Sequence, residues 1–411
     1  MSAESVKTAG FVFAALVLVA AAAWIEPGTV APEAMSDEGE PLFPQFRDVM
    51  DVKAIEVIAY NEDQATATPL KVEFRNGRWI MPSHYDYPAE ARDRLDKTAG
   101  ALLGLKKDLV ISDRLEDHAR YGVIDPLDMK VASLTGRGKR VTLRNANDEV
   151  LADVILGKPV EDHPGYRYVR LPGRKRVYGV KTAADPSARF EDWVEGNLLR
   201  LSAARIRKIT INSYSIDETL GRVTNIQRVV ATRDGSDWTI SGTRRVSTGA
   251  IRRAASALAS IRIVGARPKP RTLAEQFREG KLEMTLEAVM SLRRRGFFLS
   301  PMGRLLSNEG EMIVETDRGL VYTLRFGEIV AGAGRTSEAA PESGGRQAQT
   351  PAPETAEQNR YLLVTVRYDP QVRERYGGPS GGERAARFLS RKFSGWYYVI
   401  SGEDFKRLRA W

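Results

Sequence analysis

The sequence predicts an α+β fold: an N-terminal transmembrane helix followed by two tandem α+β repeats with antiparallel sheets. Two observations support this. An uncharged segment of 18 residues lies between Lys7 and Glu26. After it, one order of elements occurs twice: a strand, a strand carrying Trp, a helix, a hairpin whose second strand meets Gly, and an aromatic strand pair. Strands joined by hairpins, with few helices, are typical of antiparallel sheets that carry helices on one face.

The N-terminal segment, residues 1–26, is predicted to anchor the chain in a membrane. Its 18 uncharged residues span about 27 Å as a helix, which just crosses a hydrocarbon core. Lys7 precedes the segment and acidic residues follow it. This charge order places the N-terminus in the cytoplasm and the remainder outside. Two alternatives remain. Ala20 to Ala23 offer a signal-peptidase site, and a buried core helix is disfavoured because the segment is apolar all round.

Four regions follow from composition and pattern. After the anchor, residues 27–50 are acidic and contain Pro and Gly, which is typical of a flexible spacer. The first repeat occupies residues 51–203 and the second residues 204–411. Residues from about 331 to 358 are rich in Gly, Ala, Pro, Glu, Ser and Gln, so we expect a disordered insertion that can be deleted without loss of folding.

The first repeat begins with an alternating strand at 54–58, and Asn76-Gly77 is a hairpin turn signal within 70–80. Pro88 is expected to open a helix whose apolar stripe runs at helical spacing. A short helix at 113–121 should end at Gly122. The remaining strands are expected at 140–144, 150–156 (ended by Gly157), 166–171 and 176–180.

The second repeat follows the same order. Strands are expected at 209–211 and 229–240, and a helix should begin at Thr248. Thr272 to Glu275 has the pattern of a capping box, with Gly280 as the stop. A hairpin at 311–315 and 320–326 meets Gly327, and 361–366 pairs with 396–400. Matched Trp and Gly positions favour duplication with insertions; chance similarity of two ordinary α+β units is the alternative.

Composition excludes several kinds of chemistry. The chain of 411 residues has no Cys, which removes disulfides, thiolate nucleophiles and Cys-based metal sites. Its net charge of +9 favours anionic partners, although a solvated basic face is the plainer interpretation. We expect no nucleic-acid partner, because the anchor would place the folded part outside the cytoplasm.

Searching for a site yields none: we predict no catalytic, cofactor-binding or metal-binding residue and no cofactor. The only histidines are His84, His118 and His163, without metal-ligand spacing, and a solvated His is the expected case. Asp113, Glu116 and Asp117 cluster at a helix start, where they favour the helix dipole. Residues 136–140 are expected to form a basic turn and 377–382 a flexible loop, because neither has the context of a phosphate-binding loop. Trp79, Trp238 and Trp396 are expected to be core anchors.

Several short runs resemble a bacterial family known as domain of unknown function 4340 (DUF4340). The runs are Trp79-Ile80-Met81-Pro82, Tyr121-Gly122-Val123-Ile124-Asp125-Pro126, Val154-Ile155-Leu156-Gly157, Tyr168-Val169-Arg170 and Val177-Tyr178-Gly179-Val180. The resemblance covers about residues 50 to 200; the second copy lacks the Tyr-Gly…Pro turn. Members of this family carry an N-terminal membrane segment and are described beside subunits of an ABC-type transport system of the gliding-motility kind. The resemblance therefore implies an accessory role at the cell envelope, and it carries no functional residues.

These observations lead to one expected function and two alternatives. We expect a non-enzymatic, single-pass protein of the inner (cytoplasmic) membrane, with its bulk periplasmic or otherwise extracytoplasmic. It would be a binding and assembly module accessory to an ABC-type transporter, with a protein partner in the envelope. The alternatives are a structural protein that binds envelope polysaccharide through its Arg-rich second copy, and an envelope enzyme that acts on a polymer.

Overall fold

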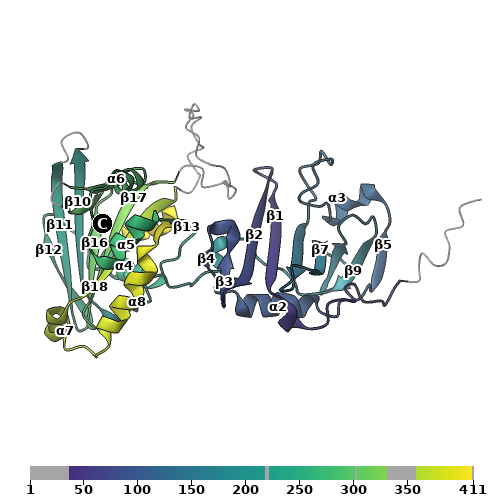
Figure 1. Cartoon of the computed structure of the whole chain (residues 1–411), viewed down its shortest axis with the longest axis horizontal. Coiled ribbons are helices and arrows are strands. Elements are labelled where there is room, and N and C mark those ends of the chain that lie inside the picture. The colour runs from purple at the N-terminus through teal and green to yellow at the C-terminus, as the bar shows by residue number, and fades with distance from the viewer. Residues whose placement is uncertain (1–36, 218–221, 301–302, 331–357, 410–411) are drawn as a thin grey trace, which may run out of the picture.

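The computed structural model describes residues 37–217, 222–300, 303–330 and 358–409. Within these residues the protein is a mixed α+β structure with two large antiparallel sheets that lie side by side (Figure 1). The antiparallel α+β prediction is thus confirmed. The expected anchor and nearly all of the expected insertion lie outside the described residues. Among the described residues, no helix is both long and apolar enough to cross a bilayer.

The first unit contains a sheet in the order β4-β3-β2-β1-β6-β7-β8-β9-β5. Its strands are β1 (Ala54–Asn61), β2 (Thr66–Arg75), β3 (Arg78–Met81), β4 (Tyr87–Pro88), β5 (Leu109–Ser112), β6 (Lys139–Arg144), β7 (Val150–Pro159), β8 (Tyr166–Arg170) and β9 (Val177–Lys181). Its helices are α2 (Arg92–Leu102) and α3 (His118–Tyr121), with the short 3-10 helices η2 (Val49–Asp51), η3 (Pro82–His84), η4 (Leu115–Asp117) and η5 (Phe190–Asp192).

The second unit contains a sheet in the order β12-β11-β10-β16-β17-β18-β19-β13 and a small β14-β15 pair. Its strands are β10 (Ile206–Asp217), β11 (Arg222–Asp234), β12 (Asp237–Gly242), β13 (Gly265–Pro268), β14 (Phe297–Leu299), β15 (Leu305–Ser307), β16 (Glu311–Thr316), β17 (Leu320–Ile329), β18 (Arg360–Tyr368) and β19 (Trp396–Ile400). Its helices are η6 (Ala203–Arg205), α4 (Thr248–Ser260), α5 (Arg271–Glu279), α6 (Leu286–Arg293), α7 (Pro370–Tyr376), α8 (Gly382–Ser394) and α9 (Gly402–Leu408).

The two sheets have the same strand order. Strands β3-β2-β1-β6-β7-β8-β9-β5 correspond position by position to β12-β11-β10-β16-β17-β18-β19-β13, and β4 is an additional edge strand. In both units the main helix, α2 or α4, follows the third strand. The second unit carries extra elements before β16 and before β19. A shared strand order with insertions in one copy is what a tandem duplication predicts.

Several local predictions are confirmed. Asn76 and Gly77 have positive φ angles and join β2 to β3, as a tight hairpin requires. The apolar stripe of α2, including Leu95, Ala99 and Leu102, is fully buried. Gly280 ends α5 in the left-handed conformation. Trp238 is buried, while Trp79 and Trp396 pack against the same core with partly exposed rings.

One predicted helix start is wrong, and one predicted capping box does not form, although its helix α5 begins at Arg271, one residue from the expected start. Pro88 lies in β4, opposite Ile80, and α2 begins only at Arg92. A proline tolerates this place because β4 is the edge strand and needs no further N–H donor. Thr272 forms no capping box: its hydroxyl donates to the Glu287 carboxylate at 2.5 Å. Thr272 thus bonds to a side chain of α6 and not to the backbone of its own helix.

The hairpin strand expected to end at Gly157 does not end there. β7 continues to Pro159, and its pairing with β8 shifts register after Leu156. Residues 229–240 form parts of two strands, β11 and β12, which turn at Gly235.

Two segments expected to be flexible are packed, the second only in part. In the described part of the acidic spacer, Leu42, Phe43 and Phe46 are buried in the core. Asp37 accepts hydrogen bonds from Tyr178 at 2.6 Å and Arg176 at 3.1 Å, so residues 37–50 belong to the first unit. The loop at 377–382 is packed only at Gly378 and Gly382, where a Cβ would collide with the backbone of Asp317 and Arg318, whereas residues 377 and 379–381 are exposed.

The two units share one hydrophobic core. Tyr87 of β4 meets Trp396 of β19 edge-on, with ring centroids 4.8 Å apart. Lys392 of α8 donates to Glu195 at 2.6 Å and to the Leu198 carbonyl at 3.0 Å. Aromatic packing and these buried polar contacts join the units into one body.

The loop between β17 and β18 provides the first test. Val330 donates its N–H to the Asn359 carbonyl at 2.8 Å, so the ends of the predicted insertion are already adjacent. We expect that replacing residues 331–358 by Asn-Gly leaves the thermal midpoint within about 4 °C of wild type, because a two-residue turn can close the hairpin. Differential scanning calorimetry checks this, and a larger fall contradicts the assignment of these residues as dispensable.

His84 provides a test of the contact between the units. It is buried against the Phe190 ring, and burial, reinforced by the positive charge of Arg267, lowers its pKa to about 4. As pH falls from about 6.5 to 4, His84 therefore binds a proton in the unfolded chain but not in the folded chain. We expect His84 to cost up to about 3 kcal/mol of the free energy of unfolding as pH falls through that window. Urea unfolding should show the free energy of unfolding of wild type falling more steeply than that of H84F as pH drops from about 6.5 to 4. The same pH dependence in both proteins would contradict the prediction.

Candidate functional site

A cavity of about 760 Å³ lies in the first unit, where three segments meet. They are η4 with α3, the loop between α3 and β6, and the β8–β9 turn. Arg140 and Arg170 line this cavity together with Asp125 and His118. The Tyr-Gly-Val-Ile-Asp-Pro run therefore lies at a pocket that gathers several charged side chains.

The Tyr-Gly turn is shaped by two glycines. Gly122 ends α3 in the left-handed conformation, and Val123 donates its N–H back to the His118 carbonyl at 2.9 Å. Gly157 of β7 lies directly beneath this turn. A Cβ there would collide with the Tyr121 carbonyl and lie 2.6 Å from Val123 Cγ1. Only a glycine fits at this position of β7, because the turn packs directly against the strand there.

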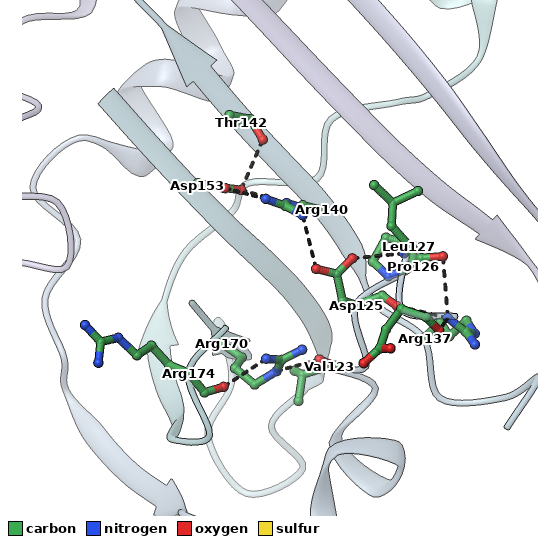
Figure 2. Close-up of polar contacts among 11 residues, drawn as sticks. Val123, Asp125, Pro126, Leu127, Arg137, Arg140, Thr142, Asp153, Arg170 and Arg174 are labelled. Carbon is green, nitrogen blue, oxygen red and sulfur yellow. Dashed lines mark hydrogen bonds and ion pairs between the residues drawn. The ribbon is translucent and has the colours of Figure 1, made fainter. Parts of the chain in front are cut away.

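Arg137 holds together the loop that follows the turn. Its guanidinium donates to the carbonyls of Asp125 at 3.0 Å, Asp128 at 2.9 Å and Val131 at 2.8 Å, as Figure 2 shows in part. It also stacks over the Tyr60 ring. The basic turn expected at residues 136–140 leads directly into β6, which begins at Lys139. Its Arg137, with five donors in a fixed geometry, closes a loop that has no regular structure of its own.

Arg140 is fully engaged with carboxylates (Figure 2). It binds both oxygens of Asp153, at 3.0 and 2.7 Å, and Asp125 at 3.2 Å. The hydrogen bonds to Asp153 raise the pKa of the Arg140 guanidinium. Such a bidentate pair is the strongest form of side-chain ion pair and leaves Arg140 with its charge neutralised.

Arg170 has a different environment. It is only 6% exposed, and it donates Nε to the Val123 carbonyl and Nη1 to the Arg174 carbonyl, both at 2.8 Å. Among the described residues, no carboxylate pairs with it and Nη2 has no hydrogen-bond partner. Burial lowers its pKa, against the opposing effect of Asp125 and Asp128. A buried, unpaired cation is costly unless something completes its contacts.

His118 is buried beside this pocket, contrary to the expectation of a solvated ring. Its Nε2 lies 2.8 Å from the Lys175 carbonyl, which assigns the proton to Nε2 in the neutral ring. Burial lowers its pKa, which the bond to that carbonyl partly offsets. His84 lies at the contact between the units and His163 is exposed, so the three histidines are apart. Within the described ranges, no three potential metal ligands come together.

The acidic cluster near α3 is used structurally. Asp113 binds Arg176 at 2.7 and 2.9 Å, and Asp117 accepts the Ser112 hydroxyl at 2.5 Å. Sequence reasoning missed Arg170 because β8 is buried on both faces at its end, where Val169 and Arg170 are both buried. When both faces of a strand are buried, the alternation of polar and apolar residues cannot show that an arginine faces inward. Chemically, the pocket offers a fixed cation and no nucleophile–base pair.

The seat of the Tyr-Gly turn can be tested by adding one methyl group. We expect G157A to lower the free energy of unfolding by about 1–3 kcal/mol, because the new Cβ overpacks against backbone that cannot move away. The matched control is G100A in α2, where the same methyl meets nothing within 4 Å. It should be neutral or stabilising by up to about 1 kcal/mol. Urea titration of both variants decides, and equal effects would contradict this role for Gly157.

Comparison with known proteins places the chain in a family without assigning an activity. No curated protein and no solved structure matches it. One family matches residues 79–292, from β3 to the end of α6, and so extends beyond the first unit into the second. This match covers just over half of the chain and includes the Tyr-Gly turn and the pocket around Arg170. The protein therefore belongs to the family described as Domain of unknown function (DUF4340).

Proposed function

We propose that this protein is a non-enzymatic binding and assembly module of the cell envelope. The observation that carries the proposal is Arg170, a buried cation at a pocket in the first unit that pairs with no carboxylate among the residues the structure describes. A preorganised cation of this kind binds an anionic group noncovalently and needs no catalytic partner. The proposal includes a membrane anchor at residues 1–26, with the two units on the extracytoplasmic side of the inner membrane.

The joined units suit an assembly role. A shared core, with Tyr87 against Trp396 and Lys392 on Glu195, keeps the two sheets in a fixed relation. A rigid body on a tether raises the local concentration of its binding surface near a neighbouring complex. The specific version, an accessory of an ABC-type transporter of the gliding-motility kind, is supported only by the family resemblance.

The alternative of a polymer-acting enzyme gains no support from the carboxyl groups. Such an enzyme would need an acid whose pKa is raised. The described carboxyl groups with a shifted pKa all shift downward: Asp37, Glu73, Asp185, Asp192 and Asp369.

One observation favours the polysaccharide alternative. A groove of about 530 Å³ between α4 and α9 is lined by Arg252, Arg253, Lys406 and Arg407. Among the described residues, Arg253 and Lys406 form no ion pair. Retention on an anionic polymer that falls steeply with salt would favour this function over the accessory one.

The accessory role can be tested in native membranes. We expect crosslinking and detergent extraction of the tagged full-length protein to recover ATPase and permease subunits, identified by mass spectrometry. A chain that begins at Asp37 is the control and should lose both membrane association and these partners, because the proposed anchor is gone. Recovery of the full-length protein alone would contradict the accessory role.

A further inference from the structure

The pocket around Arg170 has features that specify its ligand more closely. We propose that it binds a carboxylate carried on an apolar body, with Arg170 as the group that receives the carboxylate. This inference rests on the proposed function, since it names the ligand chemistry of the same binding module.

The orientation of Arg170 is fixed by the backbone. The Val123 and Arg174 carbonyls hold Nε and Nη1, so the guanidinium cannot rotate away from the pocket. Figure 2 shows it lying between these two residues, with the Arg140–Asp125 pair beyond it. One nitrogen, Nη2, remains without a partner among the described residues. Because this donor is already held in place, a ligand that binds to it pays little conformational entropy for ordering the side chain.

The surrounding charges favour a single negative charge on the ligand. Arg140 is already neutralised by Asp153 and Asp125, and in Figure 2 the side chain of Arg174 points away from Arg170. Asp125 and Asp128 are near enough to influence the pKa of Arg170. Asp125 and Asp128 would repel a phosphate dianion about twice as strongly as they repel the single charge of a carboxylate. The site therefore suits a carboxylate better than a phosphate.

The walls favour an apolar body. Ala119, Ile124 and Val131 line the cavity, and Leu115 and Leu127 stand at it with exposed fractions of 57% and 48%. Two large apolar side chains left exposed beside a buried cation match an amphiphile, whose apolar part covers them while its head reaches Arg170. An acyl chain and the C-terminal residues of an apolar peptide both present this chemistry.

The test compares ligands that differ only in the head group. Full-length protein in lipid nanodiscs is titrated by calorimetry with acetyl-Leu-Leu, with its C-terminal amide, with hexanoate, and with hexyl phosphate. We expect the carboxylates to bind at least about tenfold more tightly than the amide or the phosphate. The amide cannot form the charge-assisted hydrogen bond to Arg170, and the phosphate is repelled by Asp125 and Asp128. Tighter binding of acetyl-Leu-Leu would identify a peptide C-terminus as the source of the carboxylate, and tighter binding of hexanoate would identify an acyl chain.

Variants locate the binding. R170M should abolish the carboxylate preference, although it leaves two buried carbonyls without donors and can destabilise the fold. L127D avoids that problem because Leu127 is exposed at the pocket, and it should weaken carboxylate binding by about tenfold by adding a like charge. M129D, on the same loop and 93% exposed, does not line the pocket and should bind as wild type.

Three results would overturn the inference: equal binding of carboxylate and amide, unchanged binding in R170M, or equal effects of L127D and M129D. None of these bears on the recovery of transporter subunits in the crosslinking experiment. The proposed function and the ligand chemistry can therefore fail separately.

Discussion

In each sheet, a backbone turn is pressed against a glycine of the central hairpin at a place where no side chain fits. In the first unit the Tyr121 turn rests on Gly157 of β7. In the second, the chain around Arg295 rests on Gly327 of β17, where a Cβ would lie 2.8 Å from the Phe297 ring. The close approach sets how far each crossover segment stands from its sheet. The pocket of the first unit depends on this distance, since its lining residues lie on both sides of the turn.

The same constraint has different consequences in the two units. In the first, the chain beyond the glycine contact turns outward and is held open by Arg137, which leaves a cavity. In the second, α6 and the β14-β15 pair fill the equivalent region, and Arg295 lies over the rings of Tyr361 and Tyr397. The second unit lacks the Tyr-Gly…Pro turn, and its arginine is covered by aromatic rings. One scaffold thus carries a polar pocket in one copy and additional packing in the other.

Three arginines near the pocket show how partners determine what a cation does. Arg137 donates to loop carbonyls and shapes the backbone, while Arg140 is neutralised by Asp153 and Asp125. Arg170 donates to two carbonyls, and within the described part of the chain its Nη2 has no hydrogen-bond partner. Carbonyls orient a guanidinium without cancelling its charge, because they carry only a dipole. That difference makes Arg170 the group from which a binding role can be argued.

Sequence patterns predicted the hairpin strands of both units, the Asn76-Gly77 turn and the buried stripe of α2, because turn chemistry and apolar periodicity act over a few residues. They did not predict the edge strands β5 and β13 or the helices α6 to α9. Only the tertiary structure decided the position of Pro88 in an edge strand, the packing of Leu42 and Phe43, and the burial of His118. It also decided the site. Arg170 meets Val123 from 47 residues away along the chain, and whether a charged side chain is buried depends on such distant segments. Local patterns carry no record of these contacts, which form only when the sheet, the turn and the loop are brought together.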